Sequence, residues 1–129
     1  TTTAVAMTPA FHHLRQLLSE ANVRVAPPWT AVAAAILAQL DGGAEGKGLV
    51  ESMASAPSGR AKVSGLRFRR LLASEEPDET LLLMRRAVRL VDNKADGGQL
   101  LVAIDAWRFT ETRMKWAQRY YDNAPKAEE

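Results

Sequence analysis

The sequence contains no cysteine and only two histidines. A chain without thiols has neither a disulfide framework nor a thiolate zinc site. His12 and His13 are adjacent, so on a helix their side chains diverge by about 100° and cannot share one metal ion. We therefore expect surface or half-buried histidines, no metal centre and no cofactor.

Long apolar runs are also missing. The longest one, residues 31–38, is far too short to span a bilayer. No basic segment followed by an apolar stretch opens the chain, so we expect no secretion signal. Together with the missing cysteines, these features predict a cytoplasmic protein with no membrane partner.

Signatures of catalysis are absent as well. The glycine-rich residues 42–48 lack the spacing of a phosphate-binding loop and no strand pattern precedes them. Carboxylates such as Glu75, Glu76, Asp78 and Glu79 cluster in a turn and at a helix start, where they complement the positive end of the helix dipole. We expect no catalytic residues, and an enzyme is the least favoured class of function.

The pattern that is present predicts an all-α fold. Apolar residues make up 47% of the 129 residues, and they recur at helical spacing without strand-like alternation. We expect a compact helical bundle of about six or seven helices. The expected helices are residues 9 to 22, 29–40, 49–54, 65–74, 78–92 and 100–107, and a last one that begins at Thr110 and is followed by a frayed tail from Asn123. The expected caps are Ser64 for the fourth helix, a capping box at residues 96–99 ahead of the sixth, and Thr110 for the last.

The clearest joint is Pro57-Ser58-Gly59. It divides an N-terminal helical lobe, residues 1–58, from a C-terminal lobe with a basic face, residues 59–129, and we expect the two to share one core. Aromatic residues in the second lobe, including Trp107, Trp116 and Tyr120, could stack on nucleic-acid bases. Their helical spacing beside apolar neighbours favours core packing instead.

Charge is distributed unevenly along the chain. Residues 60–119 carry 13 Lys and Arg against 8 Asp and Glu, a net of +5, although the whole chain carries only +2. Arginine outnumbers lysine twelve to five, and its planar fork suits phosphate better than an ammonium group does. The asymmetry indicates a polyanionic partner, and solvated or salt-bridged arginines are the plain alternative.

Five segments follow one another in a recognisable order: TPAFHHLRQLL, PPWTAVAAAILAQL, SGR with RFRRLLAS, DETLLLMRRAVRLV, and AW with TRMKWAQRYY. In this order the chain resembles the CasB family, the small subunit of the type I-E CRISPR surveillance complex called Cascade. The resemblance covers residues 9 to 121. It departs from the family in lacking the polar helix that usually precedes the Pro-Ala-Phe segment and in its short central loop.

The resemblance implies a non-catalytic, all-helical protein that acts in antiviral defence. Two copies would line the inside of Cascade, beside its backbone subunits and large subunit. Its partners would then be the guide RNA, the target DNA, the displaced DNA strand of the R-loop, those subunits and a second copy of itself. Base pairing would supply sequence specificity, and the protein would supply electrostatic contacts to the strands.

The resemblance also assigns candidate nucleic-acid-binding residues. Arg60, Arg67 and Arg113 match basic positions of the family. Further candidates, chosen because they are basic and nearby, are Lys62, Arg69, Arg70, Arg108, Lys115 and Arg119. We expect the basic side chains to gather on one face. A small helix-turn-helix regulator and an adaptor that binds only protein stay open as alternatives.

Overall fold

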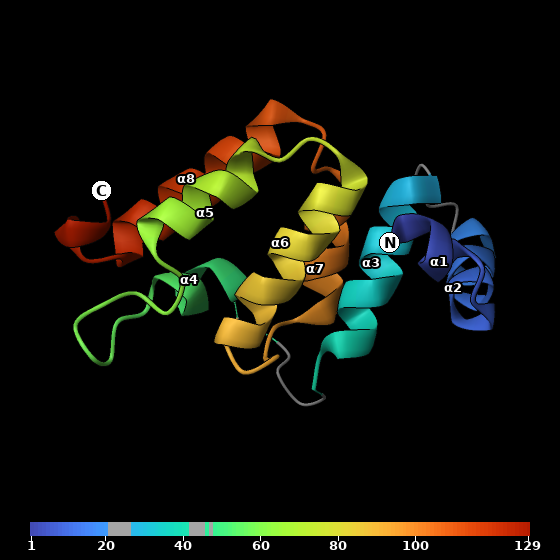
Figure 1. The fold of residues 1–129 in the computed structure, drawn as a ribbon, viewed down its shortest axis with the longest axis horizontal. Coiled ribbons are helices and arrows are strands. Elements are labelled where there is room, and N and C mark those ends of the chain that lie inside the picture. Colours follow the sequence, from blue (N-terminus) through green and yellow to red (C-terminus); the bar gives the residue numbers. More distant parts are fainter. Residues whose placement is uncertain (21–26, 42–45, 47) are drawn as a thin grey trace.

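The protein is described here from a computed structural model, which covers residues 1–20, 27–41, 46 and 48–129 (Figure 1). Over these residues the chain forms α-helices, one short 3₁₀ helix and no strand, which confirms the all-α fold class. The helices are α1 (Thr2–Ala6), α2 (Pro9–Glu20), α3 (Pro27–Gln39), α4 (Leu49–Ala54), α5 (Gly65–Ala73), α6 (Pro77–Leu90), α7 (Gly97–Asp105), α8 (Thr110–Asn123) and the 3₁₀ helix Lys126–Glu128. The predicted end of the first helix near residue 22 and the predicted glycine stop at residues 42 and 43 lie outside the described residues.

Helix α3 lies at the centre of one half of the molecule, as its nearly all-round apolar sequence predicts. Val32 and Ile36 are completely buried, and α3 packs against α1, α2, α6 and α7. Its many alanines leave room for this close approach from several sides. None of the helices in the described ranges is both long and apolar enough to cross a membrane.

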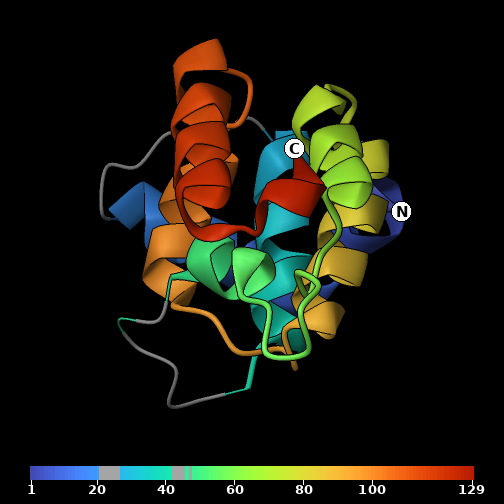
Figure 2. The same ribbon diagram turned by 90° about the vertical axis from the view of Figure 1, so that its left-hand side faces the viewer.

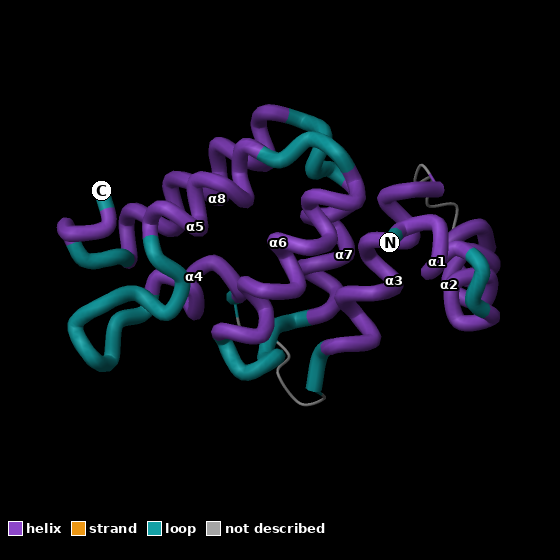
Figure 3. Tube along the Cα trace, in the orientation of Figure 1, coloured by secondary structure: helices purple, strands orange, loops and turns teal. Residues whose placement is uncertain are grey.

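Helices α4, α5 and α8 form the other half (Figure 3). The rings of Phe68 on α5 and Tyr120 on α8 stack with centroids 4.0 Å apart and an interplanar angle of 9°. Both side chains are fully buried, so this contact fixes α5 against α8. Trp107 and Trp116 are buried too, in an edge-to-face pair, and this confirms that the aromatic residues pack in the core.

One buried apolar cluster contains side chains from both sides of residue 58, for example Ile36 and Phe68. In space, α1 to α3 group with α6 and α7, while α4, α5 and α8 lie together (Figure 1). The division into lobes at residue 58 stays a prediction. Gly59 has a φ of 93°, so the predicted joint is a turn that only glycine adopts easily.

The predicted caps Ser64 and Asp96 are confirmed, and the predicted cap Thr110 is not. Ser64 caps α5 by accepting a hydrogen bond from the Arg67 N–H, and Asp96 caps α7 by accepting one from the Gln99 N–H. The expectation that Thr110 caps the last helix was wrong: Phe109 is the cap residue and Thr110 is already helical. The same helix ends at Asn123, the residue from which fraying was expected, and the chain continues into the short 3₁₀ helix Lys126–Glu128.

Helix α1 was not predicted. Its five residues form a single turn, and its β-branched threonines and valine have low helix propensity. Tertiary contacts stabilise it instead: α1 packs on α3, and the Thr2 N–H donates to Asp78 Oδ1 at 2.7 Å. This hydrogen bond holds the pKa of Asp78 below its usual value.

Candidate nucleic-acid interface

Helix α5 presents arginine on one side and core residues on the other. Phe68 and Leu71 are buried, whereas Arg67 and Arg70 are exposed and lie one turn apart. Residues three apart on a helix are neighbours on its surface. The spacing therefore places both guanidinium groups along the same stripe of α5.

Helix α6 repeats this arrangement. Met84 and Val88 are completely buried, and Arg86 and Arg89 are exposed on the outer surface, again three residues apart. The acidic residues of α6, Asp78 and Glu79, lie in its first turn at the opposite end from Arg89. The second half of α6 is therefore basic.

The two stripes meet in a groove of about 420 Å³ between α5 and α6. Four arginines line it, together with an apolar floor formed by Val63, Leu83, Ala87 and Leu90; we call it the arginine groove. Its arginines are Arg67, Arg70, Arg86 and Arg89. No carboxylate lines the groove among the described residues, so four positive charges face one cavity.

The arginine groove is also free of internal ion pairs. Within the described part of the chain, none of its four guanidinium groups makes a hydrogen bond or salt bridge; the three ion pairs found there involve other cations. Four unpaired guanidinium groups are therefore available to an external anion. Their planar donor forks match phosphate oxygens, and the apolar floor suits a sugar or base edge.

Buried hydrogen bonds hold both ends of α5 in place. The Tyr120 hydroxyl donates to the Val63 carbonyl at 2.6 Å, next to the start of α5. At the other end, Trp107 Nε1 donates to the Ser74 carbonyl at 3.1 Å, and the Ser74 hydroxyl lies 2.8 Å from that of Thr80. Burial raises the pKa of Tyr120 from 10 to about 12, so its hydroxyl stays protonated and keeps donating to a higher pH than that of an ordinary tyrosine.

The remaining predicted residues divide into two groups. Arg60 and Lys62 lie in the loop before α5, directly ahead of Val63 of the groove floor. Arg108 is exposed in the turn before α8, with its guanidinium carbon 5.1 Å from the centroid of the Phe109 ring. Of the predicted residues, Arg67 and Arg70 line the groove together. Arg60, Lys62 and Arg108 lie outside its lining.

The other predicted cations are engaged by the chain itself. Arg113 is mostly buried. It donates to the Leu72 carbonyl at 3.3 Å, and its Nη1 lies 3.7 Å from Glu75 Oε1. These two contacts hold α8 against the end of α5. Lys115 pairs with Glu111 one turn away at 3.2 Å. Arg69 donates to Tyr121 and to the Glu128 carbonyl.

Arg119 makes the strongest of these pairs. Its Nε and Nη2 donate to the two carboxylate oxygens of Glu51 on α4, at 2.8 and 2.7 Å. This two-pronged bond lowers the pKa of Glu51 below its usual value. A cation held in this way is less available to phosphate than an unpaired one, so the geometry favours the arginine groove over α8.

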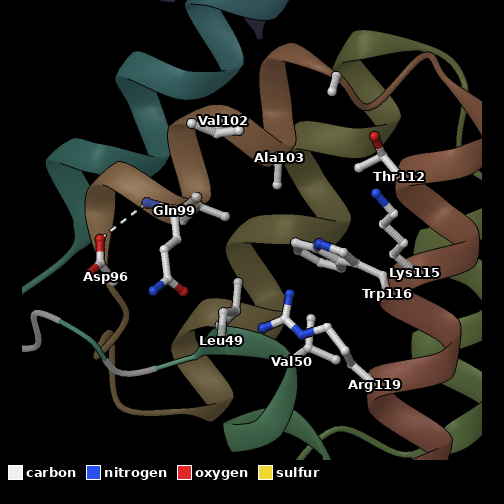
Figure 4. Close-up of a pocket in the computed structure, with 12 residues that line it drawn as sticks. Leu49, Val50, Asp96, Gln99, Val102, Ala103, Thr112, Lys115, Trp116 and Arg119 are labelled. Carbon is white, nitrogen blue, oxygen red and sulfur yellow. Dashed lines mark hydrogen bonds between the residues drawn. The ribbon is translucent and has the colours of Figure 1, made fainter.

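A second pocket, of about 300 Å³, lies between α4, α7 and α8. Figure 4 shows Lys115, Trp116 and Arg119 projecting from α8 into it, opposite Val102 and Ala103 of α7. Its walls are mainly apolar, and Asp96 joins the two cations at its rim. Because it combines both signs of charge, it is a poorer match to a polyanion than the arginine groove.

The histidines lie away from both pockets. His12 and His13 are exposed on α2, as predicted. In the ranges that the structure describes, no three His, Cys, Asp or Glu side chains lie close enough together to hold a metal ion.

The residues predicted from the sequence did not include Arg86 and Arg89, which line the arginine groove. Their spacing on an amphipathic helix was visible in the sequence, but nothing local shows that α6 packs beside α5. A search for arginine pairs at helical spacing on consecutive helices would have included them.

Comparison with known proteins gives one family match. The family model of CRISPR-associated protein Cse2 matches residues 1–121 of this chain. Cse2 is the CasB family, so the match confirms the family that the sequence resembles. No curated protein and no solved structure matches.

Proposed function

This chain belongs to the Cse2 family of CRISPR-associated proteins, the small subunits of Cascade, and on that premise we propose that its arginine groove holds the backbone of nucleic acid inside the complex. The strands in question are the guide RNA–target DNA hybrid and the displaced DNA strand. The family is a structural, non-catalytic one, so the proposed role is binding without chemistry.

The observation that carries the proposal is the set of four unpaired arginines in one groove without a carboxylate. Each phosphate that an arginine neutralises releases counterions, and four contacts give a salt slope of about −3.6 on a duplex and about −2.8 on a single strand. Arg60 and Lys62, which precede the groove floor, extend the same basic surface in this proposal.

Such contacts are too weak to act alone. Non-specific affinities of this kind correspond to a Kd of roughly 10⁻⁴ to 10⁻⁶ M at physiological salt. A subunit held inside an assembly meets the strand at an effective concentration of about millimolar, so the same contacts become significant. The exchange of a DNA duplex for an RNA–DNA hybrid is nearly balanced, and a small backbone contribution shifts it toward the open R-loop.

The partners follow from the same proposal. The backbone subunits and the large subunit of Cascade would hold this chain beside the hybrid, and a second copy would extend the basic surface. Arg113 and Arg119 contribute mainly by holding α8 against α5 and α4, because their guanidinium groups already contact the chain.

The test uses Cascade reconstituted with this chain. One variant combines Arg67→Gln with Arg86→Gln, one substitution on each helix of the groove. Its matched control combines Arg15→Gln with Lys94→Gln, which removes the same charge from exposed positions outside the groove. We expect the groove variant to bind target DNA more weakly and its salt slope to fall by about 2 relative to the parent, while the control keeps most of both.

Equal losses in the two variants would show a general charge effect and contradict the proposal. Loss of subunit assembly with unchanged DNA affinity of the assembled fraction would favour the protein-only adaptor.

A further inference from the structure

The last described residues fold back onto α5. Helix α8 ends at Asn123, Pro125 caps the 3₁₀ helix Lys126–Glu128, and the chain crosses from α8 toward α5 (Figure 2). We call residues 124–129 the acidic strap, since its side chains carry one lysine and two glutamates. The strap lies beyond the residues that match the Cse2 family.

Three hydrogen bonds link the acidic strap, α5 and the end of α8. Glu128 Oε2 accepts from the Gly65 N–H at 2.6 Å, at the positive end of the α5 dipole. Arg69 Nη1 donates to the Glu128 carbonyl at 3.0 Å and to the Tyr121 hydroxyl at 3.2 Å. A carboxylate of the strap therefore sits beside the basic helix, and the strap backbone engages Arg69.

Glycine at position 65 is what permits the contact. A Cβ at this position would overlap the main-chain oxygen of Glu128 and would come within 3.0 Å of Arg69 Nη1. Gly65 has no positive φ, so its backbone suits any residue and the close approach of the strap is the feature that requires glycine.

Arg69 is the exception among the arginines of α5. Arg67 and Arg70 face the arginine groove without partners in the described chain, whereas Arg69 is engaged by the strap. On a helix Arg69 lies about 100° from Arg70 and about 160° from Arg67, so it stands next to Arg70 on the outer surface of α5, on the side that meets Tyr121 of α8 rather than the groove. Freed from the strap, its long side chain would add a further unpaired guanidinium to the outer surface of α5, beside Arg70, where a strand bound in the groove would cross that helix.

We propose that the acidic strap is an autoinhibitory contact: it competes with nucleic acid for Arg69, and its release strengthens binding at the arginine groove. This inference rests on the proposed function. Because linkage is reciprocal, a strand that recruits Arg69 also weakens the docking of the strap. The strap thereby weakens nucleic-acid binding by the isolated chain. A strand present at high local concentration, as inside the complex, displaces the strap from Arg69.

The test measures binding of a short, fluorescein-labelled single-stranded DNA to the isolated full chain at low salt. Gly65→Ala displaces the strap without changing charge, and Gly98→Ala, near the start of α7, is the matched control. We expect Gly65→Ala to bind about two- to fivefold more tightly, with a salt slope steeper by about 0.7. Adding Arg69→Ala to Gly65→Ala should abolish this gain.

A second pair of variants separates contact from charge. Glu128→Ala and Glu129→Ala remove the same charge, but only the Glu128 side chain contacts α5. We expect tighter binding from Glu128→Ala alone. Trypsin cleavage after Lys126 reports release directly, and it should quicken in Gly65→Ala and not in Gly98→Ala.

Each result decides the question. Faster cleavage without tighter binding, unchanged cleavage, or equal gains from Glu128→Ala and Glu129→Ala would each overturn the strap proposal. Failure of the proposed function has a different signature: Arg67→Ala in the parent chain would then leave DNA binding unchanged. If no variant of the isolated chain bound DNA at all, the strap proposal would fall, whereas the proposed function is decided by the reconstituted complex.

Discussion

Replacing Tyr120 by phenylalanine tests how the arginine groove is held in place. The substitution removes one hydroxyl and leaves the ring, which stacks on Phe68 at 4.0 Å. That hydroxyl is completely buried and donates to the Val63 carbonyl at 2.6 Å. Val63 is itself buried, so its carbonyl would be left without a partner in an apolar environment.

An unsatisfied buried carbonyl costs about 1–3 kcal/mol. For a domain of this size we expect the melting temperature of Tyr120→Phe to fall by roughly 3 to 12 °C. Tyr121→Phe is the control, because its hydroxyl accepts only from exposed Arg69, and it should lose less than about 1 kcal/mol. Denaturant unfolding followed by circular dichroism measures both.

The same substitution should change how the stability of the protein depends on pH. Burial raises the pKa of Tyr120 from 10 to about 12, so the neutral form is favoured in the folded state. The stability that this contributes is fully present below pH 10 and is lost as the pH rises through about 12. The parent should therefore lose more stability over this range than Tyr120→Phe does. A variant as stable as the parent at neutral pH, with the same loss in base, would refute the reasoning.

Three further predictions concern the core and the helix ends. Phe68→Ala removes a fully buried ring and should cost about 3–5 kcal/mol, measured by denaturant unfolding; a cost below that of a surface substitution would contradict the packing described here. Glu51→Gln breaks the half-exposed pair with Arg119 and should cost at most about 1 kcal/mol, and its cost should shrink in high salt. The pKa of Asp96 is lowered by the N–H groups of Gly46 and then Gln99, so the stability that it contributes is present above pH 4 and lost as the pH falls through its lowered value. Asp96→Asn should therefore be less stable than the parent at neutral pH, with a gap that closes in acid; a constant gap would count against this.

The sequence predicted the helices with strong local signals and missed what depends on tertiary contacts. Ser64 and Asp96 each precede an apolar periodic run and act as caps. Helix α5 therefore begins where expected, and α7 begins at Gly97, directly after its cap and three residues before the expected residue 100. Helix α7 nonetheless ends at Asp105 rather than at Trp107, which lies buried in the following turn. Helix α6 ends at Leu90, two residues before the predicted end, because Asp92 and Asn93 adopt left-handed backbone angles.

The candidate site shows the same limit. Arg67 and Arg70 were identified because their pattern lies within one helix, but their neighbours Arg86 and Arg89 depend on how α5 packs against α6. Similarly, the partner of Arg119 is Glu51, 68 residues earlier in the chain, and no local pattern could have shown that this cation is engaged. The composition of the sequence shows the excess of arginine. Only the folded structure shows which arginines contact other groups of the chain and which do not.

The most direct test of the account is photo-cross-linking inside reconstituted Cascade bound to its target. A photoreactive benzoyl-phenylalanine replaces Leu90, which lines the arginine groove and is partly exposed, or Met7, which is exposed between α1 and α2. Our account predicts cross-links from position 90 to RNA or DNA and none from position 7. Cross-links from position 90 to protein alone, or nucleic-acid cross-links of equal yield from both positions, would contradict it.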